Sequence, residues 1–235
     1  MKARCSMEVI IKRIQQMVEI KNEYLKRLQN GENLRVKVSE GNSKTGKNCR
    51  TVSLIPGHDC QNCKACLHDC YDVNNVCWQQ NVQNIRALNS AIHSYNIDKY
   101  WNDIEMDIKY NYTTELRINV GGDSTYEDFI HIREIALRNL KCDFLFFTKN
   151  YNDLNKFLNE FEFPNNVRPI WSRWIGLESN NIHNVPEAHV MMSNGKTTAP
   201  EYGAYFCTGN CSECHFNNRG CWTLQEGESV VFIEH

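Results

Sequence analysis

Hydrophobic residues recur every three or four positions in several stretches of the chain, and short β-branched runs lie between these stretches. The helical pattern covers 7–28, 82–97, 99–108, 126–140 and 153–160. The strand-like runs are 50–55, 116–120, 143–148, 168–171 and 189–192. Alternating strands and helices are typical of βαβ units around a parallel sheet. The pattern therefore predicts an α/β protein whose sheet closes as a complete or partial (β/α) barrel.

The same pattern divides the chain into three parts. Residues 1–40 contain an amphipathic helix that we expect on the outside of the main domain, and residues 41–200 carry the barrel pattern. Residues 201–235 are rich in Cys, Gly and Asn, and we expect them to form a C-terminal loop region. In an α/β barrel the functional residues lie at the C-terminal ends of the strands, so we look for chemistry there.

Composition and charge narrow the class of protein. The 235 residues are 41% apolar, enough for a sizeable core, and the net charge of −2 gives no overall reason to expect a polyanion partner, although nucleic acid is not excluded. No apolar run is long enough for a membrane span or a signal peptide, so we expect a cytoplasmic protein with no membrane partner. Twelve Cys residues are many for such a protein, and nine of them fall in two short runs. This clustering predicts metal binding.

The first run begins directly after a predicted strand. Its spacing, C-x2-C-x2-C-x3-C, matches that of bacterial ferredoxins, with Tyr71 in place of the usual Pro. Zinc is the alternative, although zinc sites usually use two separated C-x2-C pairs. Cys77 follows as a spare thiol. The run predicts a 4Fe-4S cluster with the candidate ligands Cys60, Cys63, Cys66 and Cys70.

The second run lies near the C-terminus. Gly209 and Gly220 allow the backbone to turn N–H groups toward sulfur. A second iron-sulfur cluster and a structural zinc site both fit, and His215 could replace a Cys for zinc alone. The candidate ligands are Cys207, Cys211, Cys214 and Cys221. Outside both runs lie three thiols that we expect to be buried or incidental: Cys5, Cys49 and Cys142.

Three further segments at strand ends carry candidate chemistry. Gly121-Gly122-Asp123-Ser124 could let a cofactor approach the backbone, although a plain turn with a helix N-cap explains the same residues. Lys149 could neutralise a carboxylate or phosphate, or be a solvated loop lysine, and Arg173 is a candidate anion-binding fork. The cofactor-binding candidates are Gly121, Gly122, Asp123 and Ser124, and the catalytic candidates are Asp123, Lys149 and Arg173.

Several short segments together carry a family resemblance. They are NSKTGK (42–47), SLIPGHDC (53–60), RINVGGD (117–123), FFTKNY (146–151) and CTGNCSEC (207–214). Over about residues 40 to 235, the chain resembles a family of phage- and prophage-borne proteins that is named by a gene-product number. The resemblance implies that Cys60, Cys66 and Cys70 are the principal ligands, and that the protein acts in the host cytoplasm.

More distantly, the layout is similar to that of the radical-SAM enzymes. That resemblance implies a (β/α)6 partial barrel, a three-Cys loop after the first strand that binds a 4Fe-4S cluster, and a glycine stretch that receives the amino group of S-adenosyl-L-methionine (SAM). It also implies an auxiliary cluster at the second Cys run. The sequence departs from that pattern in two ways: Cys60, Cys66 and Cys70 have the spacing C-x5-C-x3-C in place of C-x3-C-x2-C, and Asp123-Ser124 replaces Glu-Pro.

Two hypotheses follow. The first is an iron-sulfur enzyme of radical-SAM type that acts on an unknown substrate, with an external electron donor whose electron cleaves SAM to a 5′-deoxyadenosyl radical. The second is a non-catalytic protein that is stabilised by zinc or iron-sulfur and binds nucleic acid or a host protein.

Overall fold

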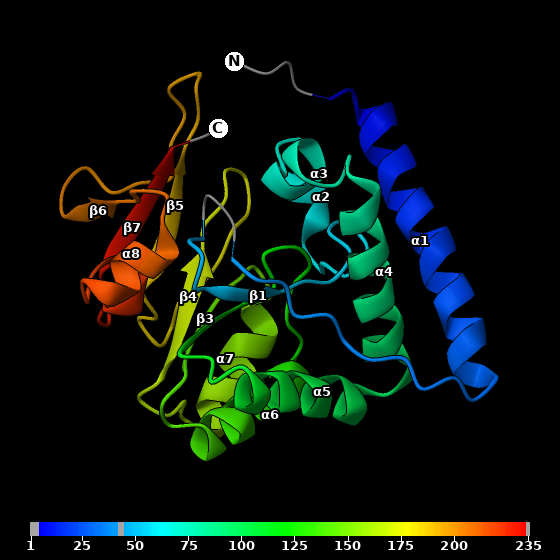
Figure 1. Cartoon of the computed structure of the whole chain (residues 1–235). Helices are drawn as coiled ribbons and strands as arrows, with labels where there is room; N and C mark the ends of the chain where they lie inside the picture. The colour runs from blue at the N-terminus through cyan, green and yellow to red at the C-terminus, as the bar shows by residue number, and fades with distance from the viewer. Residues whose placement is uncertain (1–4, 42–44, 234–235) are drawn as a thin grey trace.

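The computed structural model describes residues 5–41 and 45–233. Within these residues, eight α-helices and seven strands form a mixed α/β fold (Figure 1). The strands are β1 (Arg50–Val52), β2 (Glu115–Ile118), β3 (Asp143–Thr148), β4 (Val167–Ser172), β5 (Glu187–Met191), β6 (Ala204–Phe206) and β7 (Ser229–Ile233). The helices are α1 (Met7–Gln29), α2 (Cys63–Cys66), α3 (Tyr71–Asn75), α4 (Gln80–Tyr95), α5 (Ile97–Tyr110), α6 (Tyr126–Arg138), α7 (Tyr151–Glu160), α8 (Cys211–Phe216) and the short 3-10 helix η1 (Gly220–Trp222).

The seven described strands form one sheet in which every neighbouring pair is parallel. Their order is β1-β2-β3-β4-β5-β7-β6. The first five strands follow the order of the chain, as successive right-handed crossovers produce. The two outer strands, β1 and β6, do not pair with each other among the described residues. The predicted α/β fold with a parallel sheet is confirmed, but the sheet does not close into a barrel.

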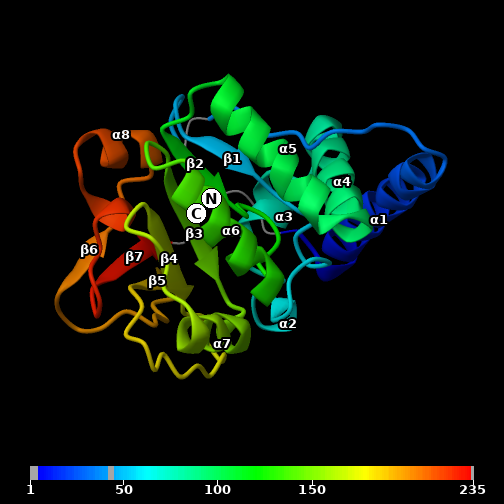
Figure 2. The ribbon, with the colours of Figure 1, turned by 90° about the horizontal axis from the view of Figure 1, so that it is seen from below.

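The sheet is buried on both faces, and β3 shows how. Phe144 and Phe146 belong to the main core with helices α4 to α7, which cover one face (Figure 2). The alternate residue Leu145 belongs to a second apolar cluster with Ile170 and Val230, which the C-terminal segment covers. A parallel strand covered on both faces has an almost continuous apolar sequence, as β3 does.

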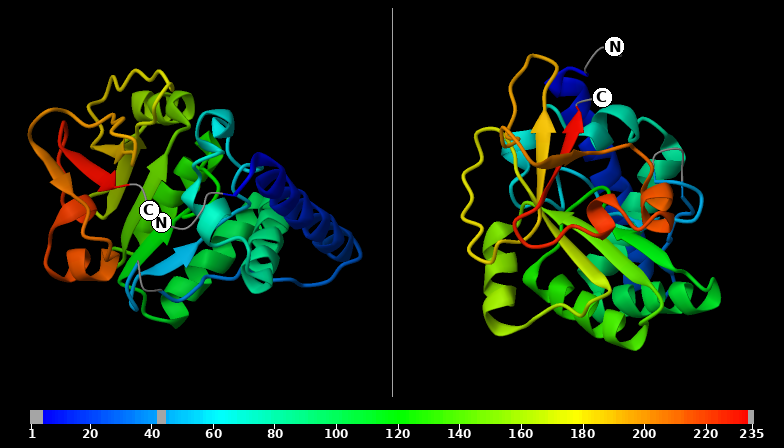
Figure 3. Two further views of the ribbon diagram at one scale, coloured as in Figure 1. Left: turned by 90° about the horizontal axis from the view of Figure 1, so that it is seen from above. Right: turned by 90° about the vertical axis from the view of Figure 1, so that its left-hand side faces the viewer.

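The helix predicted over 7–28 is α1, which packs along the outer side of α4 (Figure 3, left). It begins at Ser6, whose Oγ accepts the N–H of Val9 over 3.4 Å. Ile10 and Met17 are fully buried beneath it. No helix in the described ranges is long and apolar enough to cross a membrane.

The C-terminal segment differs from its prediction as a loop. It contains β6, α8, η1 and β7, and β7 lies between β5 and β6 in the sheet (Figure 3, right). β7 pairs with β5 from Ser229, opposite Glu187, to Ile233, opposite Met191. Its sequence, SVVFI, is a β-branched and apolar run of the kind that favours a strand. Residues near the C-terminus therefore complete the sheet and cover one of its faces.

Candidate metal centres

The first cysteine run follows β1 and lies at the carboxyl edge of the sheet. The chain leaves β1 beside the end of β2, where the Leu54 N–H donates to the Gly121 carbonyl over 2.8 Å. Gly57 adopts a φ of +80°, which favours glycine, and its N–H donates to Cys60 Sγ over 3.4 Å. α2 then carries two thiols, and Cys70 precedes α3. We call these four thiols the edge group: Cys60, Cys63, Cys66 and Cys70.

Members of the edge group are close enough to influence one another's ionisation. Burial raises the pKa of Cys60, Cys66 and Cys70, the last to about 11. Cys66 and Cys70 add to the rise at Cys60, because neighbouring thiolates repel each other. The positive charge of Lys149 acts in the opposite direction and lowers the pKa of Cys66. Buried thiols in such a set become thiolates together when a cation binds them, so the donor set fits a thiolate metal site.

The two other thiols of the run have different surroundings. Cys63 is half-buried in α2 and contributes to the raised pKa of Cys66. Cys77 is fully buried behind the loop, where its Sγ donates to Asp72 Oδ2 over 3.8 Å. Cys77 therefore has a carboxylate partner, whereas Cys63 lies beside the other edge thiols.

Gly121 and Gly122 lie at the end of β2, as the sequence predicts, but protein atoms fill the space beside both. A Cβ added to Gly121 would collide with Arg86 Nη1 and Asp72 Oδ2. A Cβ on Gly122, whose φ is +86°, would lie 2.7 Å from Leu54 Cβ. Close packing of the cysteine loop against β2 therefore explains both glycines. The structure therefore has no open space beside these two glycines for the predicted cofactor.

Asp123 connects the cysteine loop with the ends of β2 and β3. Its carboxylate accepts the N–H groups of Lys149 and Ser124 over 2.9 and 2.8 Å. Its own N–H donates to the Asp59 carbonyl over 2.8 Å. Burial raises the Asp123 pKa, and its charge in turn raises the pKa of Cys60. The predicted catalytic residue thus lies beside the edge group, with its oxygens used by backbone N–H groups.

Lys149 is the predicted catalytic residue whose charge faces the edge group. Its Nζ lies 5.2 Å from the centroid of the Trp174 ring, and its carbonyl accepts the side-chain N–H of Asn62 over 2.5 Å. Because Asn62 lies directly before α2, this bond fixes the cysteine loop to the end of β3. The charge of Lys149 favours the thiolate form of Cys66.

Sequence reasoning missed a buried ion pair behind the loop. Asp72 lies in α3 and Arg86 in α4, and Arg86 Nη2 donates to Asp72 Oδ1 over 2.6 Å, with a second contact between Nη1 and Oδ2. The two side chains are 5% and 7% exposed. The sequence contained one indication of this pair. Arg86 follows Val82 by four residues, so a charged side chain lies on the apolar face of the helix predicted over 82–97.

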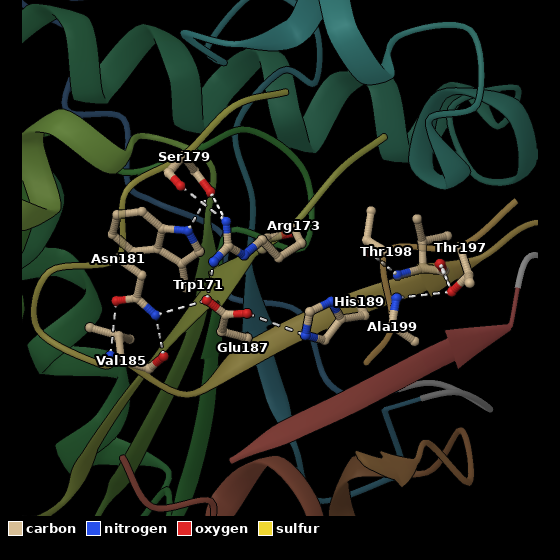
Figure 4. A network of polar contacts seen from close by, with 12 residues as sticks. Trp171, Arg173, Ser179, Asn181, Val185, Glu187, His189, Thr197, Thr198 and Ala199 are labelled. Atoms are coloured by element: carbon tan, nitrogen blue, oxygen red, sulfur yellow. Dashed lines mark hydrogen bonds and ion pairs between the residues drawn. The ribbon is translucent and has the colours of Figure 1, made fainter. Parts of the chain in front are cut away.

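Arg173 follows β4, but its guanidinium already has partners (Figure 4). Nη2 lies 2.6 Å from Glu187 Oε1, and Nη1 donates to Ser179 Oγ over 2.5 Å. His189 Nε2 lies 3.3 Å from Glu187 Oε2. Burial alone would raise the pKa of Glu187, but hydrogen bonds from His189 and Arg173 lower it to about 2. The predicted anion fork is therefore occupied by a carboxylate of the protein.

A cavity of about 680 Å³ lies beside this network. His189 is 6% exposed, and its Nδ1 has no hydrogen-bond partner among the described residues. Trp174, which contacts Lys149, connects the cavity wall to the surroundings of the edge group. The wall includes Arg173, Trp174, Glu187, His189, Tyr202 and Ser229.

The second cysteine run lies on the face of the sheet opposite the helices. Its four thiols, which we call the face group, are Cys207 after β6, Cys211 and Cys214 in α8, and Cys221 in η1. The Gly209 N–H donates to Cys207 Sγ over 3.4 Å, in the manner expected for this glycine. Thr208 Oγ1 also lies 3.4 Å from Cys214 Sγ. Polar hydrogens directed at sulfur are typical of thiolate metal sites.

Two residues from the first half of the chain, Cys49 and Arg117, lie beside the face group. Cys49 lies in the same apolar cluster as Cys211, and Arg117 Nη1 donates to Cys211 Sγ over 3.5 Å. The neighbouring Cys49 thiol and the charge of Arg117 lower the pKa of Cys211. Cys49 is buried, as predicted, but it contacts this group of thiols. His215, the alternative zinc ligand, instead lies 2.7 Å from Asp143 Oδ2.

In the described part of the chain, no three His, Cys, Asp or Glu side chains are already arranged as ligands of one metal ion. The edge and face groups are therefore defined by the two cysteine runs and by the elements that carry them. Both consist of buried or half-buried thiols with N–H donors directed at sulfur, and these donors fit iron-sulfur and zinc centres alike.

The fold and these two groups define an α/β protein with cysteines at the strand ends and on one sheet face. A family model described as Gene product 88 matches residues 24–177, more than half of the chain. The chain therefore belongs to the Gene product 88 family, a family of phage gene products. The match includes the edge group and ends before the face group. No curated protein and no solved structure matches the chain.

Proposed function

We propose that this protein is an iron-sulfur enzyme whose 4Fe-4S cluster is bound by Cys60, Cys66 and Cys70. The observation that carries the proposal is that these thiols lie on one loop at the carboxyl edge of a parallel sheet, where Cys66 and Cys70 influence the ionisation of Cys60. Active sites of α/β enzymes are built at that edge, where loops from several strands converge. The ferredoxin-like spacing of the run favours iron-sulfur over zinc.

Three thiolates leave one iron of such a cluster without a protein ligand, and that iron supplies redox or Lewis-acid chemistry when the cluster is bound. The chain's own residues hold the loop. Asp123 fixes it to the ends of β2 and β3, and the Asp72–Arg86 pair supports it from behind. Lys149 adds a positive charge that favours thiolate at Cys66.

The radical-SAM class is the form of this proposal that the sequence resemblance suggests, with SAM on the open iron and an external electron donor. The glycine segment does not fit the expected SAM cradle, because Arg86, Asp72 and Leu54 fill the space beside Gly121 and Gly122. Cluster binding and SAM binding are therefore separate hypotheses, and each has its own test.

We expect the unknown substrate in the cavity beside Arg173. Trp174 lines the cavity and lies against Lys149, whose charge acts on Cys66, so these two residues link the cavity to the edge group. The unpartnered Nδ1 of His189 offers a buried hydrogen-bonding atom to a ligand there. Buried polar atoms without a partner are costly, so a ligand that satisfies His189 gains affinity.

We also infer that the face group binds a second metal, as iron-sulfur or zinc. Its support is the set of hydrogen bonds that reach its sulfur atoms from Gly209, Thr208 and Arg117. This centre lies within an apolar cluster that includes Trp222 and Leu145, which would shield it from water.

The test of the proposed function compares Cys66→Ala with Cys142→Ala after anaerobic purification. Cys142 is 1% exposed in the main core and belongs to neither group, so it controls for the loss of a buried thiol. Iron, zinc and acid-labile sulfide per chain are measured with the visible spectrum. We expect about four irons with matching sulfide to be lost in Cys66→Ala and retained in Cys142→Ala.

Retention of all iron in Cys66→Ala would overturn the proposal. A colourless wild-type protein that contains zinc and no iron would also overturn it. That result would favour the alternative hypothesis, a non-catalytic protein with structural zinc that binds nucleic acid or a host protein.

A further inference from the structure

The face group is built from two distant parts of the chain, and the parts meet at one sulfur atom. Cys211 Sγ accepts a hydrogen bond from Arg117, which lies in β2, 94 residues earlier. Cys49, which directly precedes β1, lies in the same apolar cluster as Cys211. Cys211 thus has one hydrogen-bond donor from outside the cysteine run, Arg117, and a further thiol packed in the same cluster.

Arg117 is half-buried beside the thiols, with its Nε fully buried, and its guanidinium has few other contacts. Its guanidinium lies 4.9 Å from the centroid of the Phe147 ring on one side and reaches Cys211 on the other. Its Nε has no hydrogen-bond partner among the described residues. Arginine keeps its charge in proteins, and a buried charge is costly unless an opposite charge compensates it. Besides Asp72, whose pKa the charge of Arg117 lowers, the thiols of the face group can supply that negative charge once they ionise.

A thiolate metal centre supplies that negative charge. Four thiolates around Zn²⁺ leave a net charge of about −2, and iron-sulfur centres with four thiolates are likewise anionic. A guanidinium directed at one of these sulfurs compensates part of the charge and strengthens the site in its apolar surroundings. The position of Arg117 is therefore explained by an anionic centre next to it.

Cys49 is held in place by the same part of α8. Its N–H donates to Ser212 Oγ over 2.8 Å, and the Ser212 N–H donates to the Thr45 carbonyl over 2.8 Å. Gly46 lies against Ser212, where a Cβ would collide with its side chain. The segment 45–49 is thus attached to the start of α8, and this contact holds the Cys49 thiol in the same apolar cluster as Cys211.

We propose that Arg117 is the counter-charge of the metal centre in the face group and that Cys49 is its thiol hydrogen-bond donor, both acting on the sulfur of Cys211. The proposal rests on the inference that the face group binds metal. Both are positioning residues: they stabilise a thiolate ligand without binding the metal. Hydrogen bonds to a ligating thiolate lower its charge and slow the loss of the metal.

The experiment is carried out in a Cys66→Ala background, so that the metal counted belongs to the face group. Arg117→Met removes the charge and keeps an apolar chain, whereas Arg117→Lys keeps the charge. Arg133→Met is the matched control, because the Arg133 guanidinium lies 5.6 Å from the centroid of the Phe161 ring at an exposed position. The readouts are metal per chain and competition with a chelator, and circular dichroism verifies folding.

We expect Arg117→Met to weaken retention of the metal about 10- to 100-fold, as loss of a partner of a metal ligand typically does. Arg117→Lys should recover part of the loss, and Arg133→Met should match the parent. Unchanged affinity in Arg117→Met would overturn the role of Arg117. If Arg117→Met fails to fold, Arg117→Gln, which removes the charge and keeps a polar side chain, takes its place: metal retention below that of Arg133→Met supports the counter-charge role, and retention equal to it overturns that role.

Cys49 is tested with two substitutions in the same background. Cys49→Ser keeps a hydroxyl donor to Cys211, and Cys49→Ala removes the donor. A donor role predicts that Ser retains metal better than Ala, whereas equal loss in both variants would identify Cys49 as a ligand and overturn this part of the proposal. Absence of metal from the Cys66→Ala parent would overturn the inference that the face group binds metal. The proposal of an iron-sulfur cluster at the edge group would not be affected by that result. Full retention of iron in that parent would instead refute the proposed function.

Discussion

The two cysteine groups have opposite surroundings. The edge group lies at the strand ends beside polar residues, with Lys149 and Asp123 in front and the Asp72–Arg86 pair behind. The face group lies within an apolar cluster, and the Arg117 guanidinium donates to one of its sulfur atoms. A centre that must admit a ligand needs an open edge, whereas a centre that only holds a metal benefits from a closed apolar shell. This difference is the reason why we propose chemistry at the edge group and a supporting role for the face group.

The largest expected effect comes from breaking the support of the edge group with Asp72→Asn. The substitution leaves the Arg86 charge buried without its partner, and we expect a loss of about 3–5 kcal/mol in the free energy of unfolding. Edge iron should be lost while face metal is retained. Urea unfolding and metal analysis measure both.

The matched control is Asp107→Asn, which breaks a partly exposed pair with Arg50. We expect it to cost about 1 kcal/mol, because solvent screens that pair. Equal losses for Asp72→Asn and Asp107→Asn would show that the buried pair has no special role behind the edge group.

We expect a smaller loss of stability from a substitution at Gly121, which packs against the Asp72–Arg86 ion pair. Gly121→Ala places a Cβ against Arg86 and Asp72 and should destabilise the fold by about 1–3 kcal/mol through overpacking. In an Asp72→Ala/Arg86→Ala background the cost should nearly vanish, because the colliding atoms are gone. A double-mutant cycle by urea unfolding measures the coupling. An unchanged cost in that background would mean that the glycine is required for another reason.

The smallest effect concerns the strand ends beside the cavity. The pKa of Glu187 is lowered from its ordinary 4.5 to about 2, so its ionised form stabilises the fold above pH 4.5 and this contribution is lost as the pH falls toward 2. After allowance for solvent screening, we expect about 1 kcal/mol. Glu187→Gln should remove this part of the pH dependence in unfolding measurements between pH 5 and 3.

Glu162→Gln, on an exposed side chain, is the control for the Glu187 prediction. It should leave the pH dependence as in wild type. A wild-type curve in Glu187→Gln would contradict the account of the Arg173–Glu187–His189 network.

Local patterns predicted most of the fold, because each helix or strand is encoded by its own stretch of sequence. The 143–148 run, for example, became β3 with the same bounds. The place of β7 between β5 and β6 depends on a contact between distant segments, which no local pattern contains. The run SVVFI was itself readable as a strand, but the neighbouring cysteines and glycines favoured a loop.

The candidate sites divide in the same way. The edge group was predictable, because its thiols follow one another within a single loop. The contacts of Cys49 and Arg117 with the face group were not, because they form only when β1, β2 and α8 meet in the fold. Arg173 shows the converse case: its position at a strand end was predictable, but its ion pair with Glu187 depends on the register of β4 and β5.

The most direct test of the difference between the two groups is the EPR spectrum of the dithionite-reduced protein, recorded for wild type and Cys66→Ala with and without SAM. The account predicts a reduced-cluster signal in wild type whose edge-cluster component is lost in Cys66→Ala, which leaves no signal if the face group holds zinc and the signal of the second cluster if it holds iron-sulfur. A change on adding SAM would assign the enzyme to the radical-SAM class. An equal signal in Cys66→Ala, or no signal in a wild-type protein that contains zinc alone, would contradict an iron-sulfur centre at the edge of the sheet.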